Sequence, residues 1–287
     1  MKKGNKPENQ AVAVIKRMSS NKAAMIGLAV FLALVIVAVI APWIAPYDST
    51  MMDFTAMFAK PNAAHWFGCD ELGRDILSRI LVGSRYSLVI GLGSVGLSIV
   101  FGLILGSLAG FFGGWVDNLI MRFLDIFSSI PGMLMAIVIS AVLGSGFFNC
   151  ILAISVSTMP QYVRILRASI MSIRNMDYLE AASSLYNCSK LRITIKHILP
   201  NSLSSLIVTA TMGVASSILM AAGLSYVGLG VQPPMPEWGA ILSGARSYLR
   251  DYPHMVIFPG LILAVTSLSL NMLGDGLRDA LDPKLKK

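Results

Sequence analysis

The run AAMIGLAVFLALVIVAVIAPWIAP at residues 23–46 carries no charged side chain. A helix of about 20 consecutive apolar residues is long enough to cross the hydrocarbon core of a bilayer, so this run predicts a membrane-spanning helix. Its apolar residues are continuous and do not alternate, which disfavours a β-barrel strand. The run is also too long for the core of a signal peptide, and we expect it to be retained as a first span.

The remainder of the chain has the same character. Hydrophobic residues make up 55% of the sequence and charged residues 13%, whereas a soluble domain carries about 25% charged residues. Further apolar runs lie at about Tyr86–Phe112, Leu119–Leu143, Phe147–Leu166, Ser202–Val227 and Met255–Leu273. Because every backbone polar group must be satisfied inside lipid, the sequence predicts an all-α polytopic membrane protein with six transmembrane helices.

The formal net charge of +8 is unevenly placed along the chain. Basic residues outnumber acidic ones in residues 1–22, 164–200 and 275–287, and acidic residues are in excess in residues 47–83. Loops rich in Lys and Arg stay in the cytoplasm. We therefore expect cytoplasmic termini and an extracytoplasmic loop after the first span. The positive charge marks topology, and we expect no nucleic acid partner.

The sequence shows no recognisable set of catalytic residues. It lacks a Gly-x4-Gly-Lys-Ser/Thr phosphate loop, so we expect no ATP hydrolysis by this chain. None of the histidines is paired with another His, a Cys or an acid at metal-ligand spacing, and the cysteines show no metal-type spacing. The residues concerned are His65, His197, His254, Cys69, Cys150 and Cys188. Charges are nearly absent from the span centres, where proton-coupled carriers need them. We expect no bound metal or cofactor, and transport that is either passive or driven from outside the chain.

Two local patterns predict packing. Gly102, Gly106 and Gly110 are spaced four residues apart and form a small-residue stripe, which lets helices approach closely within one bundle or in a dimer. Arg122 and Asp125 lie three residues apart, and we expect a local ion pair near the membrane edge.

The polar stretch YLEAASSLYNCSKLRITIKHILPN at residues 178–201 interrupts the apolar runs. Glu180 falls in the first turn of a predicted helix, where the helix dipole favours a carboxylate. Ala181 and Ala182 leave that surface thin, while Leu185 and Arg192 offer an apolar anchor and a charged rim. The stretch predicts a helix that docks on another protein, with a merely interfacial amphipathic helix as the alternative.

At this point the sequence resembles a known family, the dipeptide/oligopeptide/nickel permeases of binding-protein-dependent ABC importers, second-subunit type. The resemblance covers the chain from about residue 15 to its end. It rests on several motifs in order: FGCDELGRD at 67–75, GGWVD at 113–117, EAA at 180–182 with ILP at 198–200, LSYVGLGVQPP at 224–234 and LGDGLRDALDP at 273–283.

The resemblance implies a type I ABC importer permease fold in a bacterial inner membrane, and a division of the chain. Residues 1–22 would be a cytoplasmic segment, 23–46 the first transmembrane helix and 47–85 an extracytoplasmic loop. Residues 86–274 would form the permease core and 275–287 a cytoplasmic tail. Within the core, a cytoplasmic loop at 169–200 would couple the permease to an ATPase. The implied coupling residues are Glu180, Ala181, Ala182, Leu185, Tyr186, Arg192, Leu199 and Pro200.

The implied partners are a homologous second permease, two ATPases that hold ATP and Mg²⁺, and an extracytoplasmic solute-binding protein. The implied cargo is a dipeptide or oligopeptide, with nickel or a metal chelate as the alternative. A passive channel or a carrier acting alone remains a third hypothesis, which the EAA-type loop disfavours.

The segment before the second span and the Trp after the PPMPE turn are candidate contacts with the docked receptor or the external gate: Asp70, Glu71, Arg74, Asp75 and Trp238. The competing expectations are that Asp70 caps a helix by accepting from the amides that follow it, and that Trp238 anchors the membrane interface.

Two positions depart from the family pattern. The residue six places after Glu180 is Tyr186, where relatives usually have Gly. Relatives also commonly carry a Glu in the fifth span at the position of Ala221, so we expect a pathway with one acidic group fewer.

Overall fold

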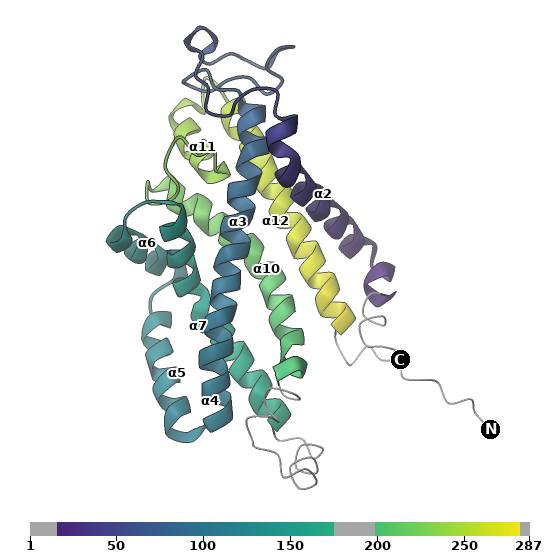
Figure 1. The fold of residues 1–287 in the computed structure, drawn as a ribbon, viewed down its shortest axis with the longest axis vertical. Helices are drawn as coiled ribbons and strands as arrows, with labels where there is room; N and C mark the ends of the chain where they lie inside the picture. Colours follow the sequence, from purple (N-terminus) through teal and green to yellow (C-terminus); the bar gives the residue numbers. More distant parts are fainter. Residues whose placement is uncertain (1–15, 175–198, 282–287) are drawn as a thin grey trace, which may run out of the picture.

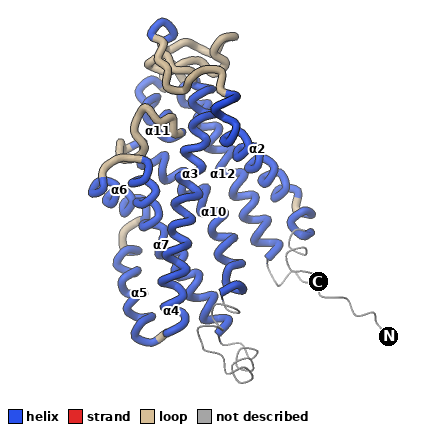
Figure 2. The backbone as a smooth tube through the Cα atoms, in the orientation of Figure 1, coloured by secondary structure: helices blue, strands red, loops and turns tan. Residues whose placement is uncertain are grey.

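The computed structural model describes residues 16–174 and 199–281, and these form an elongated bundle of helices (Figure 1). Five long helices make up its body: α2 (Lys22–Ile44), α3 (Ile76–Phe101), α7 (Phe147–Arg174), α10 (Leu199–Tyr226) and α12 (His254–Leu281). Shorter elements complete it: η1 (Phe54–Ala56), η2 (Gly102–Gly106), α4 (Ser107–Phe112), α5 (Gly114–Ser128), α6 (Gly132–Leu143), α11 (Trp238–Ala245) and η4 (Arg246–Tyr248). The described backbone contains no strand, only an isolated bridge between Cys69 and Asp75 (Figure 2). The all-α expectation is confirmed.

The helices pack in a continuous order across the bundle. Helix α12 lies between α2 and α10, and α3 contacts α2, α7 and α10. Residues 45–75 and α11 gather at one end of the bundle, the upper end in Figure 1, which we call the loop end. The turn between α4 and α5 lies at the opposite end.

Helix α2 matches the predicted first span. Asn21 begins it by accepting a hydrogen bond from the backbone N–H of Ala24 at 3.2 Å, a side-chain cap that satisfies one free amide. Gly27 lies against α12, where an added Cβ would come within 3.0 Å of the backbone nitrogen of Leu273. The opposite face exposes large apolar side chains such as Ile36, as a lipid-facing surface does.

The second span is longer than predicted. It runs from Ile76 through α3, η2 and α4 to Phe112, so it begins ten residues before the predicted start at Tyr86. The expectation that 47–85 is all loop is wrong at its end. Arg79 and Arg85 make the first turns look like a polar loop, but Arg79 is buried against the loop end and the helix continues through it.

The small-residue stripe packs within this chain. Helix α7 lies against all three glycines, and a Cβ at Gly106 would approach the carbonyl oxygen of Val163 to 2.9 Å. At Gly110 the added atom would meet the side chain of Ile170 at the same distance. Of the two uses expected for the stripe, close packing inside one bundle is the one observed.

The third predicted span is not one straight helix. The chain breaks between α5 and α6, whose axes differ by 87°. Pro131 explains the break, because a proline disfavours helical geometry in the residue before it and supplies no backbone N–H. The expectation of a continuous helix over Leu119–Leu143 is therefore wrong.

Four helices in the described residues are long and apolar enough to cross a membrane, or five if the bent pair counts as one span. Helix α7 is not among them, so the count of six spans is not confirmed. Its polar residues are used internally. Ser98 of α3 donates to the carbonyl oxygen of Ser155 at 2.9 Å and lies 2.8 Å from the hydroxyl of Thr158. A helix enclosed by others can carry such groups because they are hydrogen-bonded away from lipid.

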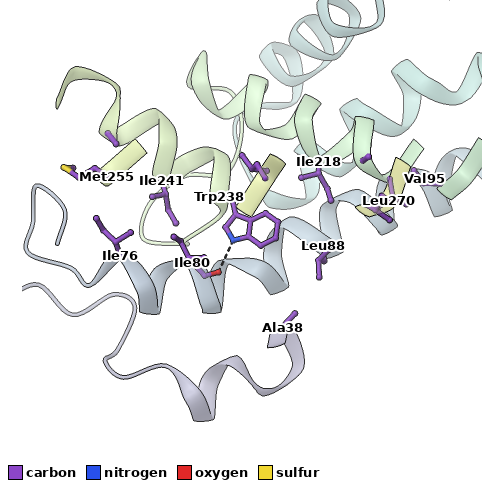
Figure 3. Close-up of a cluster of buried hydrophobic side chains, with 14 of the residues drawn as sticks. Ala38, Ile76, Ile80, Leu88, Val95, Ile218, Trp238, Ile241, Met255 and Leu270 are labelled. Atoms are coloured by element: carbon purple, nitrogen blue, oxygen red, sulfur yellow. Dashed lines mark hydrogen bonds between the residues drawn. The ribbon is translucent and has the colours of Figure 1, made fainter. Parts of the chain in front are cut away.

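The main core runs along the bundle between α3, α10, α11 and α12, and Figure 3 shows part of it around Trp238. Trp238 is its largest fully buried side chain and donates from Nε1 to the carbonyl oxygen of Ile80 at 3.0 Å. Ile241 of α11 and Met255 of α12 pack in the same cluster. Helix α11 is thus packed inside the bundle, whereas η4, which follows it, has no buried residue.

The last two long helices extend beyond their predicted ends. Helix α10 begins at Leu199, three residues before the predicted start, and α12 continues to Leu281 instead of ending at Leu273. The first part of the predicted tail, residues 275–281, is therefore helical. Ala221 of α10 is buried with Ile90 and Ile154, so this position faces the core of the chain and lines no pathway here.

Candidate functional site

The coupling residues Glu180, Ala181, Ala182, Leu185, Tyr186 and Arg192 lie outside the described residues. The structure does describe the two helices that carry this loop. Helix α7 ends at Arg174, and α10 begins with Leu199 and Pro200. The hydroxyls of Ser169 on α7 and Ser205 on α10 are 2.8 Å apart, so the two helices meet near their loop-bearing ends.

Two ion pairs join α5 to α7 at the same end of the bundle. Arg167 forms a bidentate ion pair with Asp117: its Nε donates to Oδ1 and its Nη2 donates to Oδ2. Arg164 donates from Nη2 to Asp125 at 2.8 Å. The expected pair between Arg122 and Asp125 is wrong, because the carboxylate of Asp125 turns to a neighbouring helix.

The two pairs differ in strength. The Asp117 pair is partly buried and bidentate, a geometry in which arginine binds a carboxylate most specifically. The Asp125 pair is much more exposed, and exposed pairs contribute about 0–1 kcal/mol. The GGWVD motif therefore has a physical reason: its last residue ties α5 to the helix that enters the 175–198 loop.

A second polar cluster lies at the loop end. Asp70 accepts hydrogen bonds from the backbone N–H groups of Leu72 and Arg74, both at 2.9 Å, and from Arg74 Nε at 2.7 Å. Arg74 also donates to Glu71 at 3.3 Å. Asp75 caps α3 by accepting from the N–H and the hydroxyl of Ser78, each at 2.7 Å.

These contacts correct part of the sequence prediction. Asp70 does accept from the amides that follow it, but the cap of α3 is Asp75. Asp70, Arg74 and Asp75 are buried and form an internal network, so they present no surface to another protein; Glu71 keeps 24% of its side chain exposed. Trp238 is fully buried, so the expectation that it anchors the membrane interface or contacts a receptor directly is wrong.

A small cavity of about 50 Å³ lies between this network, α3 and α11. Arg79 lines it, donates from Nη1 to the carbonyl oxygen of Ser49 at 3.2 Å, and has its Nε 3.6 Å from Asp70. That Nε is buried without a hydrogen-bond partner. The space is polar on one side and large enough to hold water.

Glu237 is a buried residue that the sequence analysis did not single out. Its Oε1 accepts from the hydroxyl of Ser87 at 3.0 Å and the N–H of Gly239 at 2.8 Å. Its Oε2 accepts from the hydroxyl of Ser225 at 3.1 Å and the N–H of Ala240 at 2.8 Å. One carboxylate thus joins α3, α10 and the start of α11. An acid just before a short apolar helix is the signal from which this cap could have been predicted.

The prediction that no histidine is paired with an acid is also wrong. His65 lies with its Nδ1 3.0 Å from Asp75 Oδ1. The nine residues between them fold back at the loop end, so their closeness in space could not be predicted from their separation in the sequence.

Comparison with known proteins decides the family. Residues 102–287 match the family described as "Binding-protein-dependent transport system inner membrane component". The chain belongs to this family. Residues 10–61 separately match the "N-terminal TM domain of oligopeptide transport permease C".

Similar curated proteins cover nearly the whole chain. The glutathione transport system permease protein GsiD of Pectobacterium atrosepticum is 46% identical over 91% of this chain and 86% of its own length. The di/tripeptide transport system permease protein DppC of Pseudomonas aeruginosa is 46% identical over 93% of this chain and 89% of its own length. The dipeptide permease DppC of Alkalihalophilus pseudofirmus is 41% identical over 98% and 94%.

Among solved structures, the inward-facing MetNI methionine ABC transporter contains a chain with a TM-score of 0.58 at 20% identity, covering 72% of this chain and 98% of that one. The shared fold confirms the ABC importer permease architecture. Family membership confirms a multi-pass inner-membrane transport component that is not itself an enzyme, and the family description places it in a system that depends on a binding protein.

Proposed function

We propose that this chain is one of two permease subunits of an ATP-driven importer for short peptides. The observation that carries the proposal is the identity of 41–46% over more than nine tenths of the chain to permeases named for dipeptides, di/tripeptides and glutathione. Glutathione is itself a modified tripeptide, so the three names share one cargo chemistry. Nickel appears in none of these three names, and peptide is the favoured cargo.

The remaining parts of the machine follow from the permease fold. A homologous second permease would complete the pathway, two cytoplasmic ATPases would hold ATP and Mg²⁺, and an extracytoplasmic binding protein would deliver the peptide. The termini and the 175–198 loop would lie in the cytoplasm, as the basic residues favour. The loop end would then face the binding protein, where Glu71 offers a partly exposed carboxylate.

The described contacts support a route for mechanical coupling. A force applied to the 175–198 loop acts on α7 and α10 together, because the two helices meet at Ser169 and Ser205. Helix α5 moves with α7, because Arg167 holds Asp117 in a two-pronged pair. Closure of the ATPases would thereby shift a block of helices as a rigid body, the usual way in which alternating access is produced.

The test is the variant Glu180→Lys in the complete transporter, reconstituted into liposomes. Asp177→Lys is the matched control, since it makes the same charge change three residues earlier. Labelled dipeptide uptake and ATP hydrolysis are measured in both. We expect Glu180→Lys to lose at least tenfold in uptake per ATP hydrolysed while the complex stays assembled, and Asp177→Lys to remain near the wild type. Unchanged uptake in Glu180→Lys would refute the coupling role.

A further inference from the structure

Three side chains with metal-binding chemistry converge at the loop end. The ligand atoms of His65, Cys69 and Asp75 all lie within 4.8 Å of one another. Cys69 is fully buried, the Asp75 side chain is 2% exposed and His65 is 17% exposed. Imidazole, thiol and carboxylate are the three groups that bind zinc in proteins. Exposed acidic groups often lie close together without binding a metal, but these three residues are largely enclosed and offer three different ligand atoms.

The backbone holds these residues in place without a ligand. The N–H of Cys69 donates to the carbonyl oxygen of Ala59 at 2.9 Å, and the N–H of Ile76 donates to that of Gly68 at 3.1 Å. The isolated bridge pairs Cys69 directly with Asp75 across this turn. Gly68 has φ +77°, a conformation that side-chain-bearing residues rarely adopt, and it allows the tight turn just before the thiol.

The imidazole is oriented from two sides. Asp75 lies 3.0 Å from its Nδ1, and the ring of Tyr47 packs on it with 4.7 Å between ring centroids. Tyr47 is itself fixed, because its N–H donates to the hydroxyl of Ser78 at 3.0 Å. Metal sites need ligands held by such supporting contacts, since these contacts reduce the entropy lost on binding.

The local charge favours a cation. The ligand atoms of Asp75 and Cys69 lie within 4.8 Å of each other, and the negative charge of this carboxylate attracts a positive ion. A divalent cation would bind the sulfur as a thiolate, because a coordinating thiol gives up its proton on binding.

We propose that His65, Cys69 and Asp75 form a binding site for a divalent cation of the zinc class, with water as the fourth ligand. The mixture of nitrogen, sulfur and oxygen donors suits Zn²⁺ and disfavours Mg²⁺ and Ca²⁺, which take oxygen ligands. Bonds of roughly 2.0–2.2 Å at a tetrahedral centre place nitrogen and oxygen ligands about 3.4 Å apart. His65 and Asp75 would therefore separate by a few tenths of an ångström.

The ion would have a structural consequence that does not depend on the cargo. Asp75 also caps α3 through its other oxygen, which bonds the N–H of Ser78 at 2.7 Å. A metal on the first oxygen would fasten the 59–75 loop to the start of the second span. Binding to the folded state alone then stabilises it by RT ln(1 + [Zn²⁺]/Kd).

The experiment uses the full chain in its assembled complex, purified without a histidine tag. Zinc content per chain is measured after equilibration with buffered Zn²⁺, and Co²⁺ serves as a spectroscopic probe because a cobalt–thiolate bond gives a near-ultraviolet charge-transfer band. The variant Cys69→Ser keeps the size of the side chain and removes the thiolate. Cys150→Ser is the matched control, since Cys150 is another buried free cysteine, in the α7 helix.

We expect the wild type and Cys150→Ser to bind one ion per chain with the cobalt–thiolate band. Cys69→Ser should lose the band and bind Zn²⁺ at least tenfold more weakly. Added Zn²⁺ should raise the thermal midpoint of the wild type and of Cys150→Ser, but not that of Cys69→Ser. Helix content by circular dichroism checks that each variant is folded. No saturable binding to the wild type, equal binding by Cys69→Ser, or loss of the band in Cys150→Ser would overturn the proposal.

Discussion

Removing the carboxylate of Glu237 should destabilise the permease, whereas changing an exposed carboxylate cap to the corresponding amide should not. In the folded chain this carboxylate accepts four hydrogen bonds and is completely buried. The change Glu237→Ala leaves the N–H groups of Gly239 and Ala240 without an acceptor. The hydroxyls of Ser87 and Ser225 lose a partner as well, but they can rotate towards other acceptors.

The magnitude follows from those partners. Each buried donor left unsatisfied costs about 1–3 kcal/mol, and loss of a helix N-cap costs about 1 kcal/mol. These contributions overlap, because the cap consists of the same N–H bonds, so we expect about 2–4 kcal/mol for Glu237→Ala. Glu237→Gln retains one oxygen and places an NH₂ group where the other was. It should lose one of the two N–H bonds and cost about half as much, roughly 1–2 kcal/mol.

The assay is unfolding in detergent micelles titrated with SDS and followed by far-ultraviolet circular dichroism. Asp53→Asn is the control, because Asp53 caps the exposed element η1 through the N–H of Thr55 and asparagine caps equally well. We expect no change for Asp53→Asn and the order wild type, Gln, Ala for position 237. A Glu237→Ala chain as stable as the wild type would show that the capping network contributes nothing, and the reasoning would fail.

Two further predictions concern the described polar groups. Asp117→Arg should reduce uptake and stability by breaking the ion pair with Arg167. The double variant that also carries Arg167→Asp exchanges the two charges and should recover at least half of the loss in the same assays. Equal loss in the single and the double variant would argue against a coupling of α5 to α7. Cys69 in the metal-free folded chain should resist maleimide at pH 7–8, because burial raises the pKa of its thiol from 9.0 to about 12 and lowers the thiolate population by about three powers of ten. The SDS-unfolded chain should react at once, and mass spectrometry of the modified peptide measures both reactions. Rapid labelling of the folded chain would contradict the burial of this thiol.

Length and hydropathy sufficed for the first span and for the all-α class, since a run such as residues 23–46 has no other stable state in lipid. They failed where polar residues lie inside the bundle. Arg79 made the start of α3 look like a loop, yet burial against the loop end lets the helix continue through it. Polar groups lower the hydropathy of α7. They are tolerated there because they form hydrogen bonds to α3 and do not face lipid.

Partner choice was also beyond the reach of sequence spacing. Arg122 stands three residues from Asp125, but Arg164 on another helix makes the pair. The turn at residues 65–75 buries Asp70 and Asp75, which composition assigns to a solvated loop. By contrast, the bend before α6 could have been predicted, because Pro131 is a local signal that acts through its own ring.

The most direct test of the account is whether residue 180 touches a nucleotide-hydrolysing subunit. The variant Glu180→Cys, in a chain whose native cysteines are replaced by serine, is treated with a short bifunctional thiol cross-linker in the assembled complex. We predict a cross-link to an ATPase subunit that carries a cysteine in its docking cleft, with a yield that changes when ATP is added. Cross-linking only to the solute-binding protein, or to no ATPase at all, would contradict the central claim.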